Sequence, residues 1–338
     1  MMLREALEKV LSSAALTFEE AARTMDIIMR GEATAVQIAG LLIALKQKGE
    51  TAQEVAGFVQ TMRDHAVKVT VDDECAVDGC GTGGDGAHTF NISTAAAIVA
   101  AAAGVTVAKH GNRSVSSKCG SADLLEVCGG NIDPGPQQVE KNIVEVGFGF
   151  MFAPSFHPAM KHAMTPRKEL GVRTVFNILG PMCNPALVKR QLIGVYDGTL
   201  LGLMADVLEI TGSTKVIVAH SRDGLDEFSV SAPTDYVEVT AGSRETKTLQ
   251  PDEVGIARCD ADALAGGDAT HNRDILTQVL QGRPGPYREA VILNAGVMIY
   301  VADRADSIGD GVRQAARALD SGAGRQLLED WIKASQMA

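Results

Sequence analysis

The pattern that most constrains the fold begins at Cys75, where short apolar runs start to alternate with helix-like stretches. The strand-like runs lie at residues 76–80, 105–108, 148–152 and 216–219, and the helical patterns between them at 94–103, 136–146 and 200–211. Such alternation is typical of a mostly parallel sheet covered by helices. Beyond Pro286 the pattern is mostly helical. We therefore predict a large α/β domain over residues 71–338 with a central, mostly parallel sheet flanked by helices.

The first 70 residues predict a small helical domain instead. Three capping boxes, each a Thr followed three residues later by Glu or Gln, mark helix starts at Thr17/Glu20, Thr34/Gln37 and Thr51/Glu54. The helix over 38–45 is so apolar that a small domain cannot hide all of it. Its surplus surface is expected to face either a second copy of the chain or the larger domain.

Composition and charge exclude several classes of protein. The 31 Lys and Arg residues against 42 Asp and Glu give a net charge of −11, which argues against binding to nucleic acid or an anionic membrane. The unbroken apolar run at 95–105 is too short to cross a bilayer. The six cysteines form no CxxC pair, and the N-terminus has acids early, so we expect a reduced, cytoplasmic protein without a signal peptide.

The densest chemical signal is a glycine-rich segment at 78–86, directly after the first strand-like run. A flexible turn at the carboxyl end of a strand exposes backbone N–H groups that can surround an oxyanion. The hydroxyl- and amide-rich segment at 89–94 follows and opens an Ala-rich helix, whose N-terminus favours anions. Each segment alone is more simply a turn or a helix cap, but together they predict a phosphate site.

A basic segment at 109–123 follows the next predicted strand. Lys109, Arg113 and Lys118 are separated by no acid, and four serines and two glycines accompany them. In α/β sheets, loops at the carboxyl ends of strands are where ligands bind. This run therefore supports the phosphate site, and His110 has only a supporting role in it.

Two further segments complete the candidate site. Asp226 and Glu227 are adjacent carboxylates beyond the strand-like run at 216–219, and beside phosphate they suit Mg²⁺, which prefers oxygen ligands. By itself, an acidic pair is most often an exposed turn. Arg167 lies in the segment 165–170 and could capture a carboxylate through two parallel hydrogen bonds, although most arginines are simply exposed.

Taken together, these segments resemble the anthranilate phosphoribosyltransferase family of tryptophan biosynthesis, and the resemblance spans nearly the whole chain. Six motifs occur in the family's order, at 81–85, 91–94, 109–113, 120–123, 177–181 and 223–227. The resemblance implies a helical domain joined by a returning helical segment near 158–185, and a homodimer formed through the helical domains. Met182-Cys183-Asn184 departs from the family's commoner Leu-Thr-Asn.

The resemblance also implies a reaction and a set of site residues. Phosphoribosyl pyrophosphate (PRPP) transfers its phosphoribosyl group to the amine of anthranilate, and pyrophosphate leaves. Ser93, Asp226 and Glu227 would contact Mg²⁺, while Gly81, Asn112 and Arg167 would hold anthranilate. The residues that would hold PRPP are Gly81, Gly84, Asp85, Thr89, Asn91, Ile92, Ser93, Thr94, Lys109, His110, Gly111, Asn112, Arg113, Ser114, Val115, Ser116, Ser117 and Ser121.

No residue is an obvious general acid or base, and we assign none. An aniline-type amine is already neutral, so its attack needs positioning more than deprotonation. Two alternatives remain open. A pyrimidine nucleoside phosphorylase would share the architecture and cleave nucleosides with phosphate and without Mg²⁺. A non-catalytic relative that binds nucleic acid would show a basic stripe and lost site residues, which the acidic composition disfavours.

Overall fold

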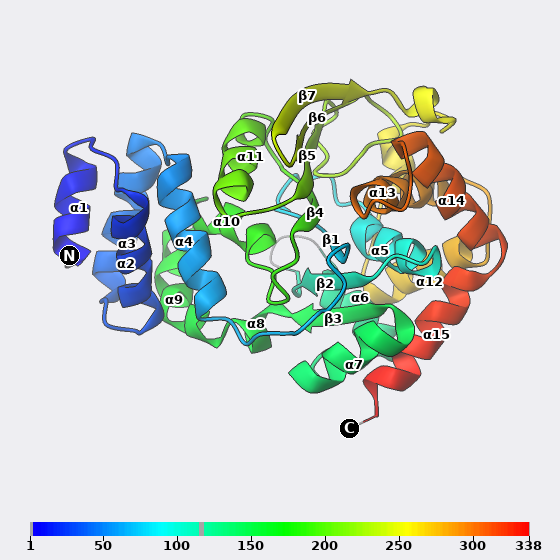
Figure 1. Ribbon diagram of the computed structural model, residues 1–338, viewed down its shortest axis with the longest axis horizontal. Coiled ribbons are helices and arrows are strands. Elements are labelled where there is room, and N and C mark those ends of the chain that lie inside the picture. The colour runs from blue at the N-terminus through cyan, green and yellow to red at the C-terminus, as the bar shows by residue number, and fades with distance from the viewer. Residues whose placement is uncertain (1–2, 115–117, 338) are drawn as a thin grey trace.

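The computed structural model describes residues 3–114 and 118–337 (Figure 1). Four helices lie at one end, a seven-stranded sheet lies in the middle, and the C-terminal helices cover the other end. The predicted fold class, a small helical domain followed by a large α/β domain, is confirmed. No helix among the described residues is long and apolar enough to cross a membrane.

The N-terminal helical domain consists of four helices, α1 (Leu3–Leu11), α2 (Phe18–Met29), α3 (Ala35–Lys48) and α4 (Ala52–Asp64). The three predicted capping boxes are all present, because the Thr hydroxyl accepts from the N3 backbone and the N3 side chain returns to the cap at Thr17, Thr34 and Thr51. Later in the chain, α9 (Lys161–Leu170) packs against α2 and α3. The position of the domain boundary near residue 70 stays a prediction.

The apolar surface of α3 is mostly used inside the monomer. Ile38, Leu41, Leu42 and Leu45 are at most 1% exposed, and only Ile43, at 42%, faces outward within the predicted stretch. The helical domain also packs on the large domain, where α4 contacts α11 (Leu200–Ile210). Of the two destinations expected for the surplus apolar surface, the structure therefore shows burial within the chain.

The sheet has the strand order β3-β2-β1-β4-β5-β6-β7, with parallel pairing from β3 through β5 and antiparallel pairing at β6 and β7. Three strands were not predicted from the sequence, namely β4, β6 and β7, and β2 begins two residues later than the predicted run. The strands are β1 (Val77–Gly81), β2 (Val107–Gly111), β3 (Phe148–Phe152), β4 (Arg190–Gly194), β5 (Lys215–Ser221), β6 (Thr234–Thr240) and β7 (Ser243–Leu249).

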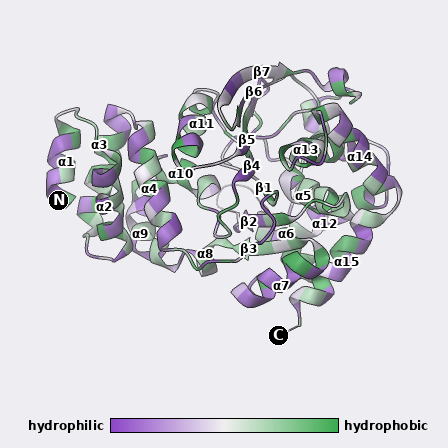
Figure 2. Ribbon diagram, in the orientation of Figure 1, coloured by the Kyte–Doolittle hydropathy of each residue, from purple (hydrophilic) through white to green (hydrophobic). Residues whose placement is uncertain are grey.

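Helices cover both faces of the sheet. Along β5, Val216 and Val218 join the core that includes α11 and the helical domain, whereas Ile217 and Ala219 join the core beneath α5 and α13. This two-residue alternation is what a strand buried on both faces requires. The edge strand β7 is hydrophilic in Figure 2 and mostly exposed, which protects the open edge from pairing with other chains.

The remaining helices connect the strands or follow the sheet. The predicted helices at 94–103, 136–146 and 200–211 are present within one or two residues at each end, and the C-terminal part is helical as expected. The α-helices are α5 (Ile92–Ala102), α6 (Ser121–Val127), α7 (Pro136–Val146), α8 (Ala153–Phe156), α10 (Phe176–Leu179), α12 (Ala269–Leu280), α13 (Pro286–Val301), α14 (Ile308–Asp320) and α15 (Ala323–Ser335), and the 3₁₀ turns are η1 (Pro158–Met160), η2 (Gly180–Met182), η3 (Pro251–Val254) and η4 (Ala261–Leu264).

The strand order places a topological switch point between β1 and β4. From β1 the chain continues outward through β2 and β3, and it then returns to pair β4 on the other side of β1. In open α/β sheets, ligands bind at the carboxyl ends of the strands beside such a switch point. The glycine-rich segment starts at this place, because Gly81 is the last residue of β1.

Candidate functional site

The glycine-rich loop is held open by contacts to the neighbouring strands. The backbone N–H of Thr82 donates to the carbonyl of Gly194, at the end of β4, at 2.9 Å. Gly83 and Gly84 have φ values of +64° and +78°, which glycine adopts without strain. The N–H of Gly83 donates to Oδ2 of Asp226 at 2.7 Å. The loop is thus fixed at the switch point with a carboxylate seated against it.

The N-terminus of α5 lies beside this loop. Ser93 donates its backbone N–H to Oε1 of Glu227 at 3.2 Å. The Asn91 side chain does not cap the helix, because it donates to the carbonyl of Cys119 at 3.1 Å and accepts from Asn272 at 2.9 Å. The hydroxyl of Thr94 is buried without a hydrogen-bond partner among the described residues. The helix start therefore keeps polar groups that its own chain does not use.

Two other members of the predicted segment have structural surroundings. Thr89 forms an isolated antiparallel bridge with Ala265, and Ile92 is 1% exposed within the large apolar core. Any contact that Ile92 makes with a ligand would therefore come from its backbone.

Asp226 and Glu227 follow β5 and reach across the ends of β1 and β4. Gly81 and Gly194 make this approach possible, since a Cβ at either position would collide with Asp226. Burial raises the pKa of Asp226, and the charge of Asp85 raises it further. Burial likewise raises the pKa of Glu227, and the neighbouring charge of Asp226 acts in the same direction. The raised pKa values mean that both carboxyls lack enough positive charge nearby.

This donor set fits a hard divalent cation. The described residues contain no ready-made cluster of three or more His, Cys, Asp or Glu side chains for a metal. Mg²⁺, however, is usually held by one or two carboxylates together with water and substrate phosphates. Two half-buried carboxyls beside a glycine loop therefore suit a Mg²⁺ ion that binds together with a phosphorylated ligand.

The structure corrects the predicted surroundings of Lys109 and His110. Both lie within β2 instead of in a loop after it, and they are 1% and 7% exposed. The Lys109 ammonium donates to the carbonyl of Gly79 at 2.6 Å, beneath the glycine loop, and its charge lowers the pKa of Glu227. The His110 ring packs against His157 with centroids 5.2 Å apart, and burial lowers the pKa of both imidazoles.

The segment after β2 forms a turn tied to α6. Gly111 leaves space for the Ser121 hydroxyl, which donates to the carbonyl of Asn112 at 3.2 Å. Arg113 pairs with Asp123 at 2.9 Å and with Glu126 at 2.7 Å on the surface. In this arrangement its guanidinium is occupied by acids.

Of the other residues predicted in this turn, the structure describes Ser114 but not the three that follow it. The backbone N–H of Ser114 donates to Oδ2 of Asp123 at 3.0 Å. Val115, Ser116 and Ser117 lie outside the described residues.

Arg167 lies on α9, beside the helical domain. It is half-buried, and its guanidinium lies over the Phe176 ring with Cζ 5.0 Å from the ring centroid. Burial lowers the pKa of Arg167. No hydrogen bond or ion pair links it to the glycine loop or to the acidic pair within the described parts of the chain. The structure thus joins the glycine loop and the start of α5 directly to the acidic pair but links Arg167 to none of them.

Arg173 is a residue at the glycine loop that the sequence analysis missed. Its guanidinium donates to the carbonyl of Gly84 and stacks on the Tyr196 ring with Cζ 4.0 Å from the centroid. Its own carbonyl accepts from the Lys46 ammonium on α3 at 2.6 Å. Arg173 therefore connects the glycine loop to the helical domain. Only its place just before the 177–181 motif could have drawn attention to it.

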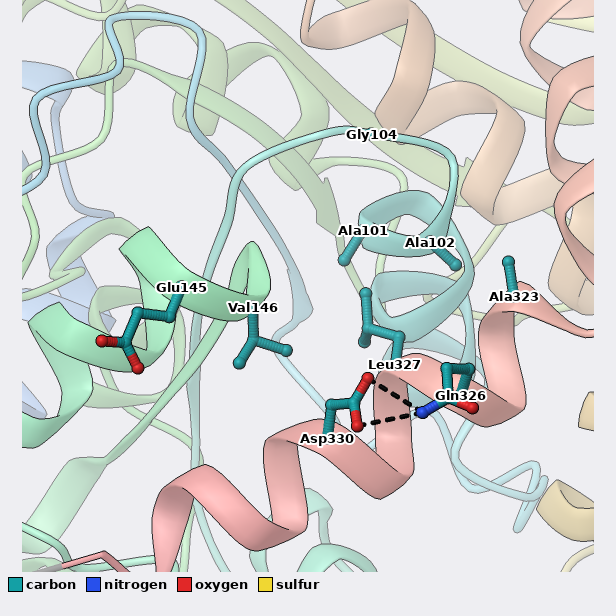
Figure 3. A pocket seen from close by; sticks show the side chains of 9 residues that line it. All are labelled: Ala101, Ala102, Gly104, Glu145, Val146, Ala323, Gln326, Leu327 and Asp330. Carbon is teal, nitrogen blue, oxygen red and sulfur yellow. Dashed lines mark hydrogen bonds between the residues drawn. The ribbon is translucent and has the colours of Figure 1, made fainter.

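An open groove elsewhere on the molecule is separate from this site. It has a volume of about 520 Å³ and lies between the ends of α5 and α7 and the start of α15 (Figure 3). Its walls are Ala101, Ala102, Gly104, Glu145, Val146, Ala323, Gln326, Leu327 and Asp330, none of which the sequence analysis placed in the site.

Comparisons with known proteins define the class of this chain. Residues 4–66 match the glycosyl transferase family, helical bundle domain, and residues 73–325 match the glycosyl transferase family, a/b domain. The chain therefore belongs to the class of glycosyl transferases, with both of the domains that define the family.

Individual relatives narrow the class further. Anthranilate phosphoribosyltransferase from Desulfatibacillum aliphaticivorans is 47% identical over 335 residues, covering 99% of both chains. The crystal structure of the Thermus thermophilus enzyme is similar with a TM-score of 0.93 and 42% identity, covering 98% of this chain and 99% of that one. The Saccharomyces cerevisiae enzyme in complex with PRPP and Mg has a TM-score of 0.91 and 26% identity, covering 99% of this chain and 98% of that one.

The chain belongs to the anthranilate phosphoribosyltransferase family. The family and the enzyme class expected from the six motifs are confirmed. These relatives support neither the pyrimidine nucleoside phosphorylase nor the non-catalytic nucleic-acid-binding alternative.

Proposed function

We propose that this chain transfers the phosphoribosyl group of PRPP to the amine of anthranilate, with Mg²⁺ bound at Ser93, Asp226 and Glu227. One observation carries the proposal above all. Asp226 and Glu227 hydrogen-bond to the backbone of the glycine loop and of the α5 start, at 2.7 and 3.2 Å, although burial raises the pKa of both, as do the charge of Asp85 at Asp226 and the charge of Asp226 at Glu227. A site that holds acids against phosphate-binding backbone needs a cation between acid and phosphate.

In the proposed reaction the amine nitrogen bonds to the anomeric carbon while the bond from that carbon to pyrophosphate breaks. Positive charge develops on the ribose and negative charge on the leaving group, so electrostatic stabilisation of pyrophosphate is the main task of the site. Mg²⁺, when bound, spreads this negative charge over the pyrophosphate oxygens. The N-terminus of α5 adds the fixed positive end of a helix dipole.

The predicted PRPP residues fall into two groups according to their surroundings. Gly81, Gly84, Asp85, Asn91, Ser93 and Thr94 belong to the glycine loop and the α5 start, where the Thr94 hydroxyl, without a partner among the described residues, supports direct contact with substrate. Lys109 and His110 are buried in β2. We propose that Lys109 acts from beneath the loop, as the positive charge that balances Glu227.

The anthranilate side is proposed to include Arg167, Asn112 and Gly81. A half-buried guanidinium that has no ionic partner among the described residues can pair with a substrate carboxylate. The Saccharomyces cerevisiae relative has been solved in complex with 4-fluoroanthranilate, which supports an aromatic acid as the second substrate. Because Arg167 is on α9 and the loop is on β1, both substrates would meet between the two domains.

The proposal also covers the domain division, the assembly and the location of the chain. The division at residue 70 is supported by the packing of α1–α4 with one another, and the return near 158–185 by the packing of α9 on α2 and α3. Val36, 82% exposed, and Ile43, 42% exposed, leave apolar surface on α3 for a homodimer through the helical domains. A cytoplasmic location is supported by the biosynthetic activity of the relatives and by six free cysteines.

The deciding experiment follows the loss of anthranilate fluorescence with PRPP, with and without Mg²⁺. We expect turnover only when both PRPP and Mg²⁺ are present. Turnover that continues after complete removal of divalent cations would contradict the metal site, and no turnover under any condition would contradict the proposed function. A parallel assay with thymidine and inorganic phosphate covers the phosphorylase alternative, for which we expect no cleavage.

A further inference from the structure

Asp78 is a fully buried carboxylate to which the proposed reaction gives no role. It lies on β1, three residues before Gly81, and it is 0% exposed. Its Oδ1 accepts from the backbone N–H of His110 at 3.2 Å, and its Oδ2 accepts from Nδ2 of Asn184 at 2.7 Å. Burial raises the pKa of Asp78, while Lys109 and the amide of Asn184 lower it.

The partners of Asp78 come from different parts of the site. His110 is on β2, next to Lys109. Asn184 follows η2 and is 1% exposed; its Nδ2 also donates to the carbonyl of Ala108 at 2.9 Å, and its Oδ1 accepts from the N–H of Ala186 at 2.8 Å. Through the side chains of Asp78 and Asn184, β1 and β2 are joined to the segment that follows α10.

That segment leads back to the anthranilate side of the proposed site. Phe176, against which Arg167 stacks, is the first residue of α10, and η2 follows α10 directly. The carbonyl of Pro181, within η2, accepts from Nε2 of Gln191 on β4 at 2.8 Å. The segment is therefore tied to β1, β2 and β4, three adjacent strands whose ends carry or adjoin the glycine loop.

The chemistry of these contacts requires a carboxylate. Among the described residues, the groups that hydrogen-bond to Asp78 are all donors, and the nearby Lys109 ammonium is 1% exposed. An ionised carboxylate only accepts hydrogen bonds, so Asp78 satisfies the His110 N–H, the Asn184 amide and the Cys80 thiol at once. An asparagine there would direct its NH₂ group at one of them, and a buried donor would lose its acceptor.

We propose that Asp78 is a positioning residue. Together with Asn184 it fixes β2, the strand that carries Lys109 and His110, against the segment 176–184, whose Phe176 ring packs on Arg167. The inference rests on the proposed function, because it gives the network the task of holding PRPP and anthranilate in attack geometry. Small displacements of reacting groups reduce rates strongly, so the network acts on turnover without touching either substrate.

The test compares Asp78→Asn with a variant in which donor and acceptor are exchanged, Asp78→Asn with Asn184→Asp. We expect Asp78→Asn to lower kcat/KM by at least about tenfold in folded protein. The exchange restores a complementary pair, in which an amide on β1 donates to a carboxylate after η2. Its kcat/KM should therefore be at least about threefold higher than that of Asp78→Asn alone. Recovery stays partial because the new carboxylate cannot donate to the carbonyl of Ala108, as the Asn184 amide does.

The matched control is Asp73→Asn. Asp73 also accepts hydrogen bonds, from the Thr106 hydroxyl at 2.6 Å and the Cys75 N–H at 2.8 Å, but it precedes β1 at the end away from the glycine loop. The kcat/KM of Asp73→Asn should equal that of the wild type. Circular dichroism and thermal unfolding of each variant show that the kinetics are measured on folded protein.

Each outcome decides the inference. Wild-type kinetics for folded Asp78→Asn, or a loss that the exchange does not reduce, would overturn it. If Asp78→Asn does not fold, Asn184→Ser leaves Asp78 in place and removes the amide that donates to it, together with the Asn184 contacts to Ala108 and Ala186; it should lower kcat/KM in folded protein, and wild-type kinetics would then overturn the role. Wild-type turnover is measured first: an inactive wild type contradicts the proposed function, whereas an active wild type with unaffected variants contradicts only the positioning role.

Discussion

Arg167 is a charged residue that we expect to pair with a carboxylate of the substrate. Its half-buried guanidinium stacks on Phe176 and has no ionic partner among the described residues. Because a charge-assisted hydrogen bond contributes about 1.5–3 kcal/mol, Arg167→Ala should raise the KM for anthranilate by about tenfold or more. The KM for PRPP should change little. Steady-state kinetics with each substrate varied in turn measures both values.

The control for this prediction is Lys168→Ala. Lys168 is the next residue of α9 and is exposed, so removal of its charge should leave both KM values unchanged. Equal increases in the two KM values of Arg167→Ala would remove Arg167 from the anthranilate site.

Asp226 and Glu227 should determine how the enzyme responds to Mg²⁺. The double variant Asp226→Asn with Glu227→Gln removes both negative charges but keeps the hydrogen-bond acceptors for Gly83 and Ser93. Since carboxylates are the charged ligands in such a site, the Mg²⁺ concentration for half-maximal turnover should rise by about tenfold or more. An unchanged Mg²⁺ titration would show that the ion binds elsewhere.

At the same scale, the sequence could predict which residues lie near one another but not what each one contacts. The motifs correctly placed Gly81, Ser93, Asp226 and Glu227 near one another. Lys109 was expected in a ligand-binding loop after the strand, yet its ammonium is buried beneath Gly79. The difference arises because the direction of a side chain depends on where β2 ends, and apolar patterning does not fix strand ends to within two or three residues.

Among the elements, the start of α4 is the most firmly built part of the helical domain. The Glu54 carboxylate, 0% exposed, accepts from the Leu16 N–H at 2.9 Å and from the Lys48 ammonium at 2.8 Å, in addition to closing its capping box with Thr51. Removing one partner of a buried ion pair costs about 3–5 kcal/mol. Glu54→Gln, which keeps the shape, should therefore lower the free energy of unfolding by about 3 kcal/mol in urea titrations.

Glu20→Gln is the matched control for Glu54→Gln. Glu20 also occupies the N3 position of a capping box and pairs with Lys9 at 2.6 Å, but its side chain is 20% exposed. A pair that water reaches contributes about 0–1 kcal/mol, so this variant should be destabilised far less. Equal losses for the two glutamates would contradict the importance of burial.

Strand prediction depended on how apolar each strand is. The five-residue strand β4, Arg-Gln-Leu-Ile-Gly, contains only two large apolar residues, and the edge strand β7 is almost wholly polar. Both are held by their neighbours: β4 pairs with β1 and β5, and β7 pairs with β6. Tertiary pairing therefore specifies these strands, whereas β5, which is buried on both faces, was evident from its sequence.

On the scale of the whole molecule, the two domains share a core. Apolar side chains of α2, α3 and α4 belong to the same cluster as Val216 and Val218 of β5 and Met204 of α11. Arg63, near the end of α4, donates to the carbonyls of Met182 at 2.8 Å and Thr211 at 3.3 Å across this contact. The capping boxes of the helical domain were readable from the sequence, but these contacts join residues more than a hundred positions apart and needed the structure.

The stability of the whole chain should depend jointly on pH and Mg²⁺. The raised pKa values of Asp226 and Glu227 mean that the folded chain holds these protons more tightly than the unfolded chain. Their contribution to the free energy of unfolding is therefore lost as pH rises through the folded pKa values. The lowered pKa values of His110 and of His157, the latter about 4, act at the other end: their contribution is present above the ordinary imidazole pKa and is lost as pH falls below it.

Mg²⁺ should offset the loss of stability at high pH but not the loss of stability at low pH. Metal binding requires deprotonated carboxylates and stabilises only the folded chain, so the increase in Tm on adding Mg²⁺ should be larger at about pH 8 than at about pH 6. Differential scanning calorimetry at both pH values, with and without the metal, measures this. The variant Asp226→Asn with Glu227→Gln should lose the Mg²⁺ effect and, without metal, unfold at a higher temperature than the wild type at pH 8, because it no longer buries two charges. An equal Mg²⁺ shift at both pH values would show that these carboxyls do not take up the ion.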